Sequence, residues 1–183
     1  MNASPSAADF DDLLAANRDF AASFSLAGFD GVARAGVAVV TCMDSRIDPL
    51  GMLGLAPGDA KILRHPGGRV TDAALTALVI GVHLLQVRRI LVVEHTRCAM
   101  ATETEQQLVA RLSEASGRDA SWMSLGVISD QTQSIREDVA KVRAHPLMAS
   151  GVVVGGFLYD VDTGLLHPVD QAGGDGRDAV ASA

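Results

Sequence analysis

Two short apolar runs constrain the fold of this chain more than any other feature. Residues 36–41 read Gly-Val-Ala-Val-Val-Thr, and residues 90–93 read Ile-Leu-Val-Val. Neither run alternates with polar residues, so each fits a short strand that is buried on both faces of a parallel sheet. Runs of this kind favour an α/β protein.

Further segments extend this pattern. Residues 60–63 and 150–159 predict two more strands, and residues 165–169 predict a hairpin edge after the turn at 162–164. Helical spacing of apolar residues predicts helices over residues 7–24, 71–86, 102–116 and 130–145. Strands that alternate with helices predict an α/β fold with a mainly parallel sheet of four to five strands flanked by helices. We find no repeat or linker, so we expect a single domain over residues 1–183, with loose termini at about residues 1–5 and 171–183.

The four predicted helices differ in their apolar surface. The segment 71–86 is apolar nearly all round, which predicts a buried central helix. The segment 102–116 is mostly polar and predicts an exposed helix. The segment 130–145 predicts a second exposed helix, with Ile135, Val139 and Val142 on one face. The segment 7–24 predicts an amphipathic helix whose apolar face needs something to cover.

Charge and apolar content exclude several classes of partner. The chain has 15 Lys and Arg against 22 Asp and Glu, a formal net charge of −7, and no basic run. This balance argues against binding to nucleic acid or to an anionic membrane surface. The longest apolar stretch, residues 73–85, is too short to span a bilayer, and residues 1–24 lack the apolar core of a secretory signal. We therefore expect a cytoplasmic protein whose two cysteines stay reduced.

The residues that follow the two apolar runs can form a metal site. Residues 42–46 read Cys-Met-Asp-Ser-Arg, and residues 94–98 read Glu-His-Thr-Arg-Cys. If the two strands are neighbours, Cys42, His95 and Cys98 can converge at the carboxyl edge of the sheet. Two thiolates and an imidazole suit Zn²⁺ and leave a fourth position open. The alternative interpretation is that both cysteines are buried core thiols.

Two further residues can serve a reaction at such a site. Asp44 can accept a hydrogen bond from a zinc-bound water, and Arg46 can hold the Asp44 carboxylate in a forked ion pair. The alternative is that Asp44 and Arg46 form a purely structural pair. Two neighbouring roles also stay open from the sequence. Arg64 can brace the Asp44 loop or bind an anion, and His65 can line the pocket.

With these motifs, the sequence resembles the β-class carbonic anhydrases, in particular their short bacterial members. The resemblance is carried by Cys-x-Asp-Ser-Arg at 42–46, Arg-x-x-Gly-Gly-x-Val at 64–70 and His-x-x-Cys at 95–98. It extends from about residue 10 to residue 169 and includes Tyr-Asp-Val-x-Thr-Gly at 159–164.

The resemblance implies a β-carbonic anhydrase-like fold with Zn²⁺ bound by Cys42, His95 and Cys98. It implies Asp44 and Arg46 as the catalytic residues. The implied reaction is the reversible hydration of CO2 to bicarbonate and a proton, with zinc-bound hydroxide as the nucleophile. The resemblance also implies a homodimer or a dimer of dimers, with the N-terminal helix packed over a neighbouring subunit.

Three departures from the family pattern leave the substrate open. Ala99 follows the second cysteine where many members have Gly, Glu94 precedes the histidine, and residues 64–67 read Arg-His-Pro-Gly. Relatives in this family hydrolyse carbonyl sulfide or carbon disulfide, so a zinc hydrolase of these molecules is the alternative function. A third alternative is a catalytically silent zinc-binding protein on the same scaffold.

Overall fold

The computed structural model describes residues 7–169 of the chain. The chain divides into two compact units, Met1–Asp30 and Gly31–Ala183. The expectation of a single domain over residues 1–183 stays a prediction. The termini that we expected to be loose, residues 1–5 and 171–183, lie outside the described residues.

The first unit contains the amphipathic helix that the sequence predicts. A 3-10 turn, η1 (Ala7–Phe10), leads into α1 (Asp11–Ala21). No residue of α1 is buried. The large apolar side chains of this segment are exposed, namely those of Phe10, Leu13, Leu14, Phe20 and Phe24.

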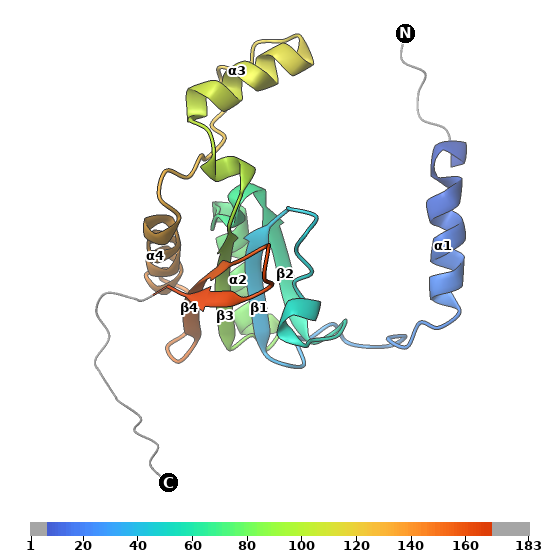
Figure 1. Cartoon of the computed structure of the whole chain (residues 1–183). Coiled ribbons are helices and arrows are strands. Elements are labelled where there is room, and N and C mark those ends of the chain that lie inside the picture. Colours follow the sequence, from blue (N-terminus) through green and yellow to red (C-terminus); the bar gives the residue numbers. More distant parts are fainter. Residues whose placement is uncertain (1–6, 170–183) are drawn as a thin grey trace. The chain divides into compact units, whose positions relative to one another are not determined.

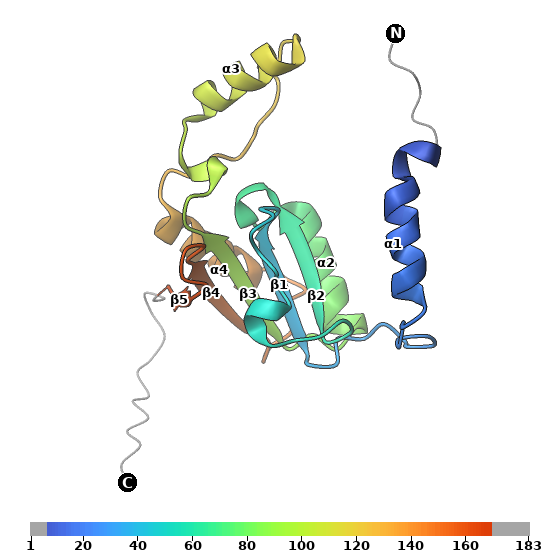
Figure 2. The ribbon, with the colours of Figure 1, turned by 45° about the vertical axis from the view of Figure 1, so that its right-hand side comes forward.

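The second unit is built on one five-stranded sheet of order β2-β1-β3-β4-β5 (Figures 1 and 2). The strands are β1 (Val37–Cys42), β2 (Ala60–His65), β3 (Arg89–His95), β4 (Val153–Tyr159) and β5 (Leu166–Pro168). The first four strands are mutually parallel, and β5 pairs antiparallel with β4. All six residues of β1 are buried, as its uninterrupted apolar sequence predicts. The predicted α/β fold with a mainly parallel sheet is therefore confirmed.

Two helices cover one face of this sheet. Alternate residues of β1 and β3, including Val40 and Val92, share one apolar cluster with α2 (Asp72–Leu84) and α4 (Gln131–Arg143). On the other face, Val39 and Val93 pack with residues around a short 3-10 turn, η2 (Gly51–Leu53). Both central strands are thus covered on both sides, which is what a run without polar alternation requires.

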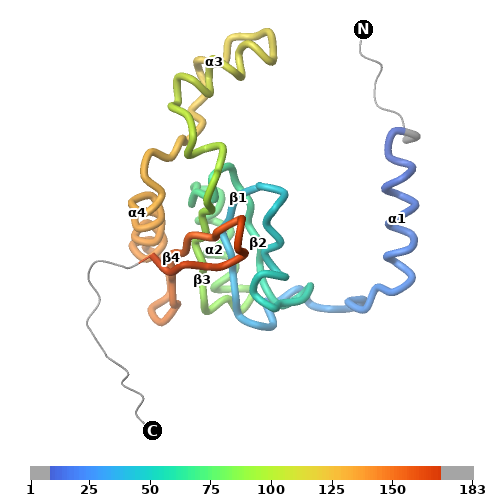
Figure 3. Tube along the Cα trace, viewed as in Figure 1, coloured from blue at the N-terminus to red at the C-terminus, as the bar shows by residue number. Residues whose placement is uncertain are grey.

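The remaining helix, α3 (Glu105–Ser116), stands apart from the sheet. The chain leaves the sheet after β3, forms α3 and returns to α4 (Figure 3). No residue of α3 is buried, which agrees with the polar pattern of its sequence. We call residues 102–129 the α3 arm.

The prediction that the segment 71–86 forms a buried central helix is wrong for the single chain. Helix α2 buries Ala74, Leu75, Leu78 and Gly81, but Ile80 and Leu84 are exposed. An apolar composition shows that a helix has apolar faces on several sides, but a helix packed on a sheet buries only the face that meets the sheet. Among the described residues, no helix has the length and apolar character needed to cross a membrane.

Candidate metal centre

The sheet topology brings the two sequence motifs together. Strands β1 and β3 are parallel neighbours, with Thr41 paired to Val93, so both strands end at the same edge of the sheet. Cys42 is the last residue of β1, and His95 is the last residue of β3. The two strands are therefore adjacent, as the convergence of Cys42 and His95 requires.

A tight turn returns Cys98 to the same place. Arg97, between His95 and Cys98, has a φ of 54°, in the left-handed region that few residues other than glycine adopt. Such a local conformation persists only where the surrounding structure enforces it, and it often occurs at functional sites. The side chain of Arg97 pairs with Asp162 outside the cluster, at 2.7 Å.

The three predicted ligands form one buried cluster. Potential ligand atoms of Cys42, His95 and Cys98 all lie within 4.8 Å of one another. The two sulfur atoms are 4.0 Å apart. Tetrahedral zinc with two sulfur ligands at about 2.3 Å would separate those sulfurs by about 3.8 Å, so the observed spacing fits the ion with a small adjustment.

The hydrogen bonds of His95 also fit a metal ligand. Its Nδ1 atom lies 2.9 Å from the carbonyl oxygen of Thr96, which can only accept, so Nδ1 carries the proton. In the neutral ring, Nε2 therefore presents a lone pair. Nε2 is buried and has no hydrogen-bond partner among the described residues. A buried nitrogen without a partner is costly unless it binds something, and a metal ion would satisfy it.

Proximity changes the ionisation of the two thiols. The hydrogen bond with Cys98 lowers the pKa of Cys42, and the same interaction together with burial raises the pKa of Cys98. The pair therefore holds one negative charge readily and resists the second. A divalent cation between the sulfurs would favour the thiolate form of both cysteines.

Asp44 lies beside the cluster and is held there by Arg46. Arg46 donates from Nε to Asp44 Oδ1 at 2.9 Å and from Nη2 to Oδ2 at 2.7 Å. The Arg46 backbone amide also donates to Oδ1, and Nη2 reaches the carbonyl oxygen of Arg97 at 3.2 Å. These hydrogen bonds from Arg46 hold the pKa of Asp44 well below its usual range. Asp44 Oδ2 lies 3.9 Å from His95 Nε2, so the carboxylate faces the ligand atoms.

Arg64 braces the loop that carries Asp44. It donates from Nε to the carbonyl oxygen of Cys42 at 2.9 Å and from Nη2 to that of Asp44 at 2.5 Å. Of the two roles considered for Arg64, these contacts support the bracing one. The side chain of His65 is half-buried at the end of β2.

Apolar side chains surround the cysteines. Ile47 belongs to the same buried cluster as Cys42 and Cys98, and Met52, Met100, Ala101 and Tyr159 pack against it. This lining separates the ligand atoms from solvent on several sides. It provides an apolar environment beside the three candidate ligands.

The loop after β2 packs closely against the backbone of β1 and β3. Gly68 has a φ of 76°, and a Cβ atom there would lie 2.6 Å from the carbonyl oxygen of Val93 and 3.1 Å from the Cys42 nitrogen. Only glycine fits this position without a shift of the backbone. The glycine at position 68 is therefore explained by close packing.

Three polar residues near the site were not singled out from the sequence. Gln131, Ser134 and Asp138 of α4 contact His95, Glu94 and Arg69 respectively. The segment 130–145 predicts a helix with one apolar face, and that pattern predicts that these polar residues are exposed to solvent. The available signal was their spacing of three and four residues beside Ile135 and Val139, which places them at the edge of the buried face.

Comparison with known proteins identifies the family. A family profile described as carbonic anhydrase matches residues 37–166, which is most of the chain. The chain belongs to the β-carbonic anhydrase family. Beta-carbonic anhydrase 1 of Mycobacterium tuberculosis is 32% identical, over 87% of this chain and 96% of the relative.

Two further comparisons show the range of the family. The crystal structure of a carbonic anhydrase from Streptococcus mutans superposes with a TM-score of 0.81 at 36% identity, covering 93% of this chain and all of that one. A carbon disulfide hydrolase from Acidianus is 30% identical, over 73% of this chain and 76% of the relative. The family membership of this chain is therefore compatible with more than one activity.

Proposed function

We propose that this β-carbonic anhydrase family member binds Zn²⁺ through Cys42, His95 and Cys98 and catalyses the reversible hydration of CO2 to bicarbonate and a proton. The observation that carries the proposal is the placement of Asp44, held by Arg46 with one oxygen 3.9 Å from His95 Nε2. A purely structural zinc site would close with a fourth protein ligand. Among the described residues, the metal-binding group consists of three.

Each residue of the site has a distinct part in this proposal. Zinc bound there would supply Lewis acidity, which makes water a nucleophile near neutral pH. Asp44 Oδ2 accepts a hydrogen bond from the reacting water and orients its lone pair toward the substrate carbon. Because its pKa is held low, Asp44 stays ionised and remains an acceptor at neutral pH.

Arg46 and Arg64 act by position. The two hydrogen bonds from the Arg46 side chain engage both oxygens of the Asp44 carboxylate, which keeps Asp44 from binding the metal as a fourth ligand. Arg64 fixes the backbone of Cys42 and Asp44 through their carbonyl oxygens. The apolar residues Met52, Met100 and Tyr159 suit a small, uncharged linear substrate.

A second candidate function is the hydrolysis of carbon disulfide or carbonyl sulfide by the same residues. The 30% identity with the carbon disulfide hydrolase from Acidianus supports this second candidate. Both molecules have the linear shape of CO2, so the same carboxylate and apolar lining would serve them.

We propose a homodimer or a dimer of dimers located in the cytoplasm. Exposed apolar side chains on two helices support an assembly, since Phe20 of the first unit and Ile80 and Leu84 of α2 are uncovered in the single chain. A subunit interface would remove this apolar area from water.

The decisive assay compares three gases on one preparation of known zinc content. We expect proton release from CO2 to exceed sulfide release from carbonyl sulfide and carbon disulfide. Sulfide release without CO2 hydration would support the second candidate. Turnover of none of the three gases by zinc-loaded protein would contradict both and indicate a silent scaffold.

A further inference from the structure

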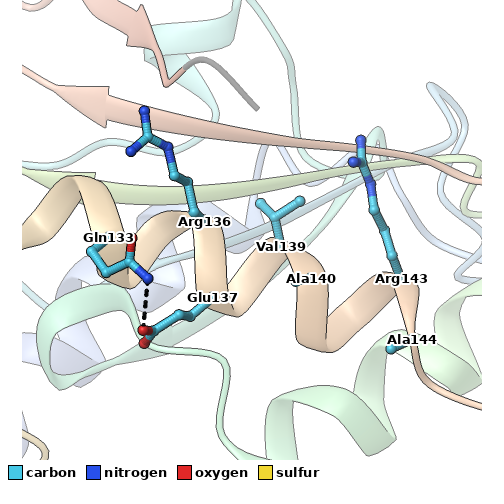
Figure 4. A pocket seen from close by; sticks show the side chains of 7 residues that line it. All are labelled: Gln133, Arg136, Glu137, Val139, Ala140, Arg143 and Ala144. Carbon is cyan, nitrogen blue, oxygen red and sulfur yellow. Dashed lines mark hydrogen bonds between the residues drawn. The ribbon is translucent and has the colours of Figure 1, made fainter. Parts of the chain in front are cut away.

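Helix α4 presents two polar surfaces with different surroundings. One side carries a pocket of about 620 Å³ lined by Gln133, Arg136, Glu137, Val139, Ala140, Arg143 and Ala144 (Figure 4). Gln133 donates to Glu137 on this side, at 3.0 Å. Three other polar residues, Gln131, Ser134 and Asp138, point to the protein interior, and we call them the inward polar face of α4.

Two members of the inward polar face, Ser134 and Asp138, are buried among apolar residues, and Gln131 is half-buried. Ser134 is 5% exposed and Asp138 is 3% exposed, and both lie beside the core residues Ile135 and Val139. The spacing of three and then four residues places Gln131, Ser134 and Asp138 along one line on the helix.

Two of these residues contact the end of β3. Gln131 Nε2 donates to the carbonyl oxygen of His95 at 2.8 Å. Ser134 Oγ donates to Glu94 Oε1 at 2.6 Å. His95 is therefore restrained twice, at its ring by Thr96 and at its backbone by Gln131.

The third residue anchors the loop after β2. Asp138 accepts from Arg69 Nε at 2.8 Å, from Arg69 Nη2 at 3.1 Å and from the Val70 amide at 2.8 Å. Arg69 directly follows Gly68, whose backbone presses against Cys42 and Val93. Helix α4 thus contacts both the end of β3, which carries His95, and the loop after β2, which packs against Cys42.

Stability alone gives a poor account of this arrangement. Glu94 is fully buried, and its Oε2 atom has no hydrogen-bond partner among the described residues. Burying a carboxyl group with incomplete hydrogen bonding is unfavourable, and apolar residues at such positions often stabilise a protein as well or better. Groups around a metal ligand that fix its orientation are a known reason to keep such contacts.

We propose that Gln131 and Ser134 are positioning residues for the zinc site. From helix α4 they hold the end of β3 in place, Gln131 through the backbone of His95 and Ser134 through the side chain of Glu94. This inference rests on the proposed zinc function. It predicts that the inward polar face contributes to metal affinity and not only to folding.

The test compares Gln131→Leu with Gln133→Leu. Each variant removes one glutamine side-chain amide from α4, and the two positions are two residues apart. Zinc affinity is measured by competition with a chromogenic chelator, and the absorption spectrum of the cobalt-substituted protein reports ligand geometry. We expect Gln131→Leu to weaken zinc binding about 10-fold or more, in the range seen for outer contacts of metal ligands, and to alter the cobalt spectrum. Gln133→Leu should match the wild type in both.

A second pair guards against a simple folding defect. Ser134→Ala should also weaken zinc binding, and Ser134→Thr, which keeps the hydroxyl, should restore most of it. Equal zinc affinity and cobalt spectra for Gln131→Leu and Gln133→Leu would overturn the proposal. A lower Tm of the metal-free protein with unchanged zinc affinity would also overturn it, because that result indicates a structural role only. If the wild type itself bound no zinc, the proposed function would fail instead.

Discussion

The metal-site end of the sheet and the α3 arm are held together by different kinds of contact. At the metal site, residues far apart in sequence are linked, as Arg69 is to Asp138 and Ser134 is to Glu94. In the arm, most of the contacts are local. Thr104 and Gln107 form a capping box, and Gly117 ends α3 in the left-handed conformation.

This difference separates two kinds of requirement on the sequence. The metal site needs several segments in register, so a change there should affect metal binding and stability together. The arm depends mainly on contacts among its own residues, so a change there should have a small and local effect.

Replacing a proposed ligand should have the largest effect. Cys98→Ser should lower zinc affinity by more than about 100-fold, because binding energies of about 10–16 kcal/mol are shared among three or four ligands. Zinc content after dialysis against a chelator measures the loss. Thermal unfolding should show a lower Tm, since metal binding stabilises the folded state. Unchanged zinc content would remove Cys98 from the ligand set.

Replacing the carboxylate beside the ligands should separate binding from catalysis. Asp44→Asn should retain zinc but lose about 100-fold or more in kcat for CO2 hydration, because the amide presents a weaker acceptor that Arg46 no longer pairs with. Asp162→Asn is the matched control, since Asp162 pairs with Arg97 at the surface. It should stay close to wild type. Full activity of Asp44→Asn would remove Asp44 from the mechanism.

Two glycines with similar backbone angles allow a direct comparison of the regions. Gly68 and Gly117 have φ values of 76° and 65°, but only at Gly68 would a Cβ atom collide with backbone. Gly117→Ala should lower the free energy of unfolding by about 1 kcal/mol, the cost of the left-handed conformation. Gly68→Ala should cost about 3 kcal/mol, because the backbone clash is added to the same conformational term.

Urea denaturation of both glycine variants measures these values, and zinc titration extends the comparison. Gly68→Ala should also bind zinc more weakly, whereas Gly117→Ala should bind it as the wild type does. Equal losses of stability at the two positions would mean that the loop after β2 does not constrain the site.

The smallest effect concerns the pH dependence of the α3 arm. The backbone amides of Leu125 and Val127 donate to Glu105 and lower its pKa below the usual value. A lowered folded-state pKa means that the stabilisation is present above the unfolded pKa of about 4.3 and is lost as the pH falls through the folded value. The arm should therefore loosen in acid, as the pH falls below the unfolded pKa of a glutamate.

The fluorescence of Trp122 can report this step, because it is the single tryptophan of the chain and lies in the arm. The wild type should show an acid transition in emission that Glu105→Gln lacks. Glu114→Gln, an exposed change on the same helix, is the control and should keep the transition. A transition that persists in Glu105→Gln would assign it to another group.

The contrast also explains what the sequence could predict. The strands were predictable because β1 and the centre of β3 are covered on both faces, and residues 36–41 and 90–93 form apolar runs without polar alternation. The Cys-His-Cys cluster was predictable because Cys42 directly follows one such run, His95 lies two residues beyond the other, and parallel neighbours end at the same edge. Both inferences depend on local patterns and one rule of topology.

Other features depend on contacts that no local pattern reports. Ser134 and Asp138 look like solvent-facing polar residues, and only the approach of β3 and the loop after β2 shows why they are buried. The exposure of Ile80 and Leu84 could not be predicted for the same reason. The sequence of an apolar helix does not indicate which of its faces packs against the rest of the chain. Long-range packing decides these cases.

The most direct test of the account is an anomalous difference map at the zinc absorption edge from crystals of the active protein. We predict one strong peak at the end of β1 and β3, within about 2.3 Å of the sulfur atoms of Cys42 and Cys98 and about 2.0 Å of His95 Nε2. The Asp44 carboxylate should remain paired with Arg46. Crystals of active protein in which these three side chains point apart, or in which zinc lies elsewhere, would contradict the assignment.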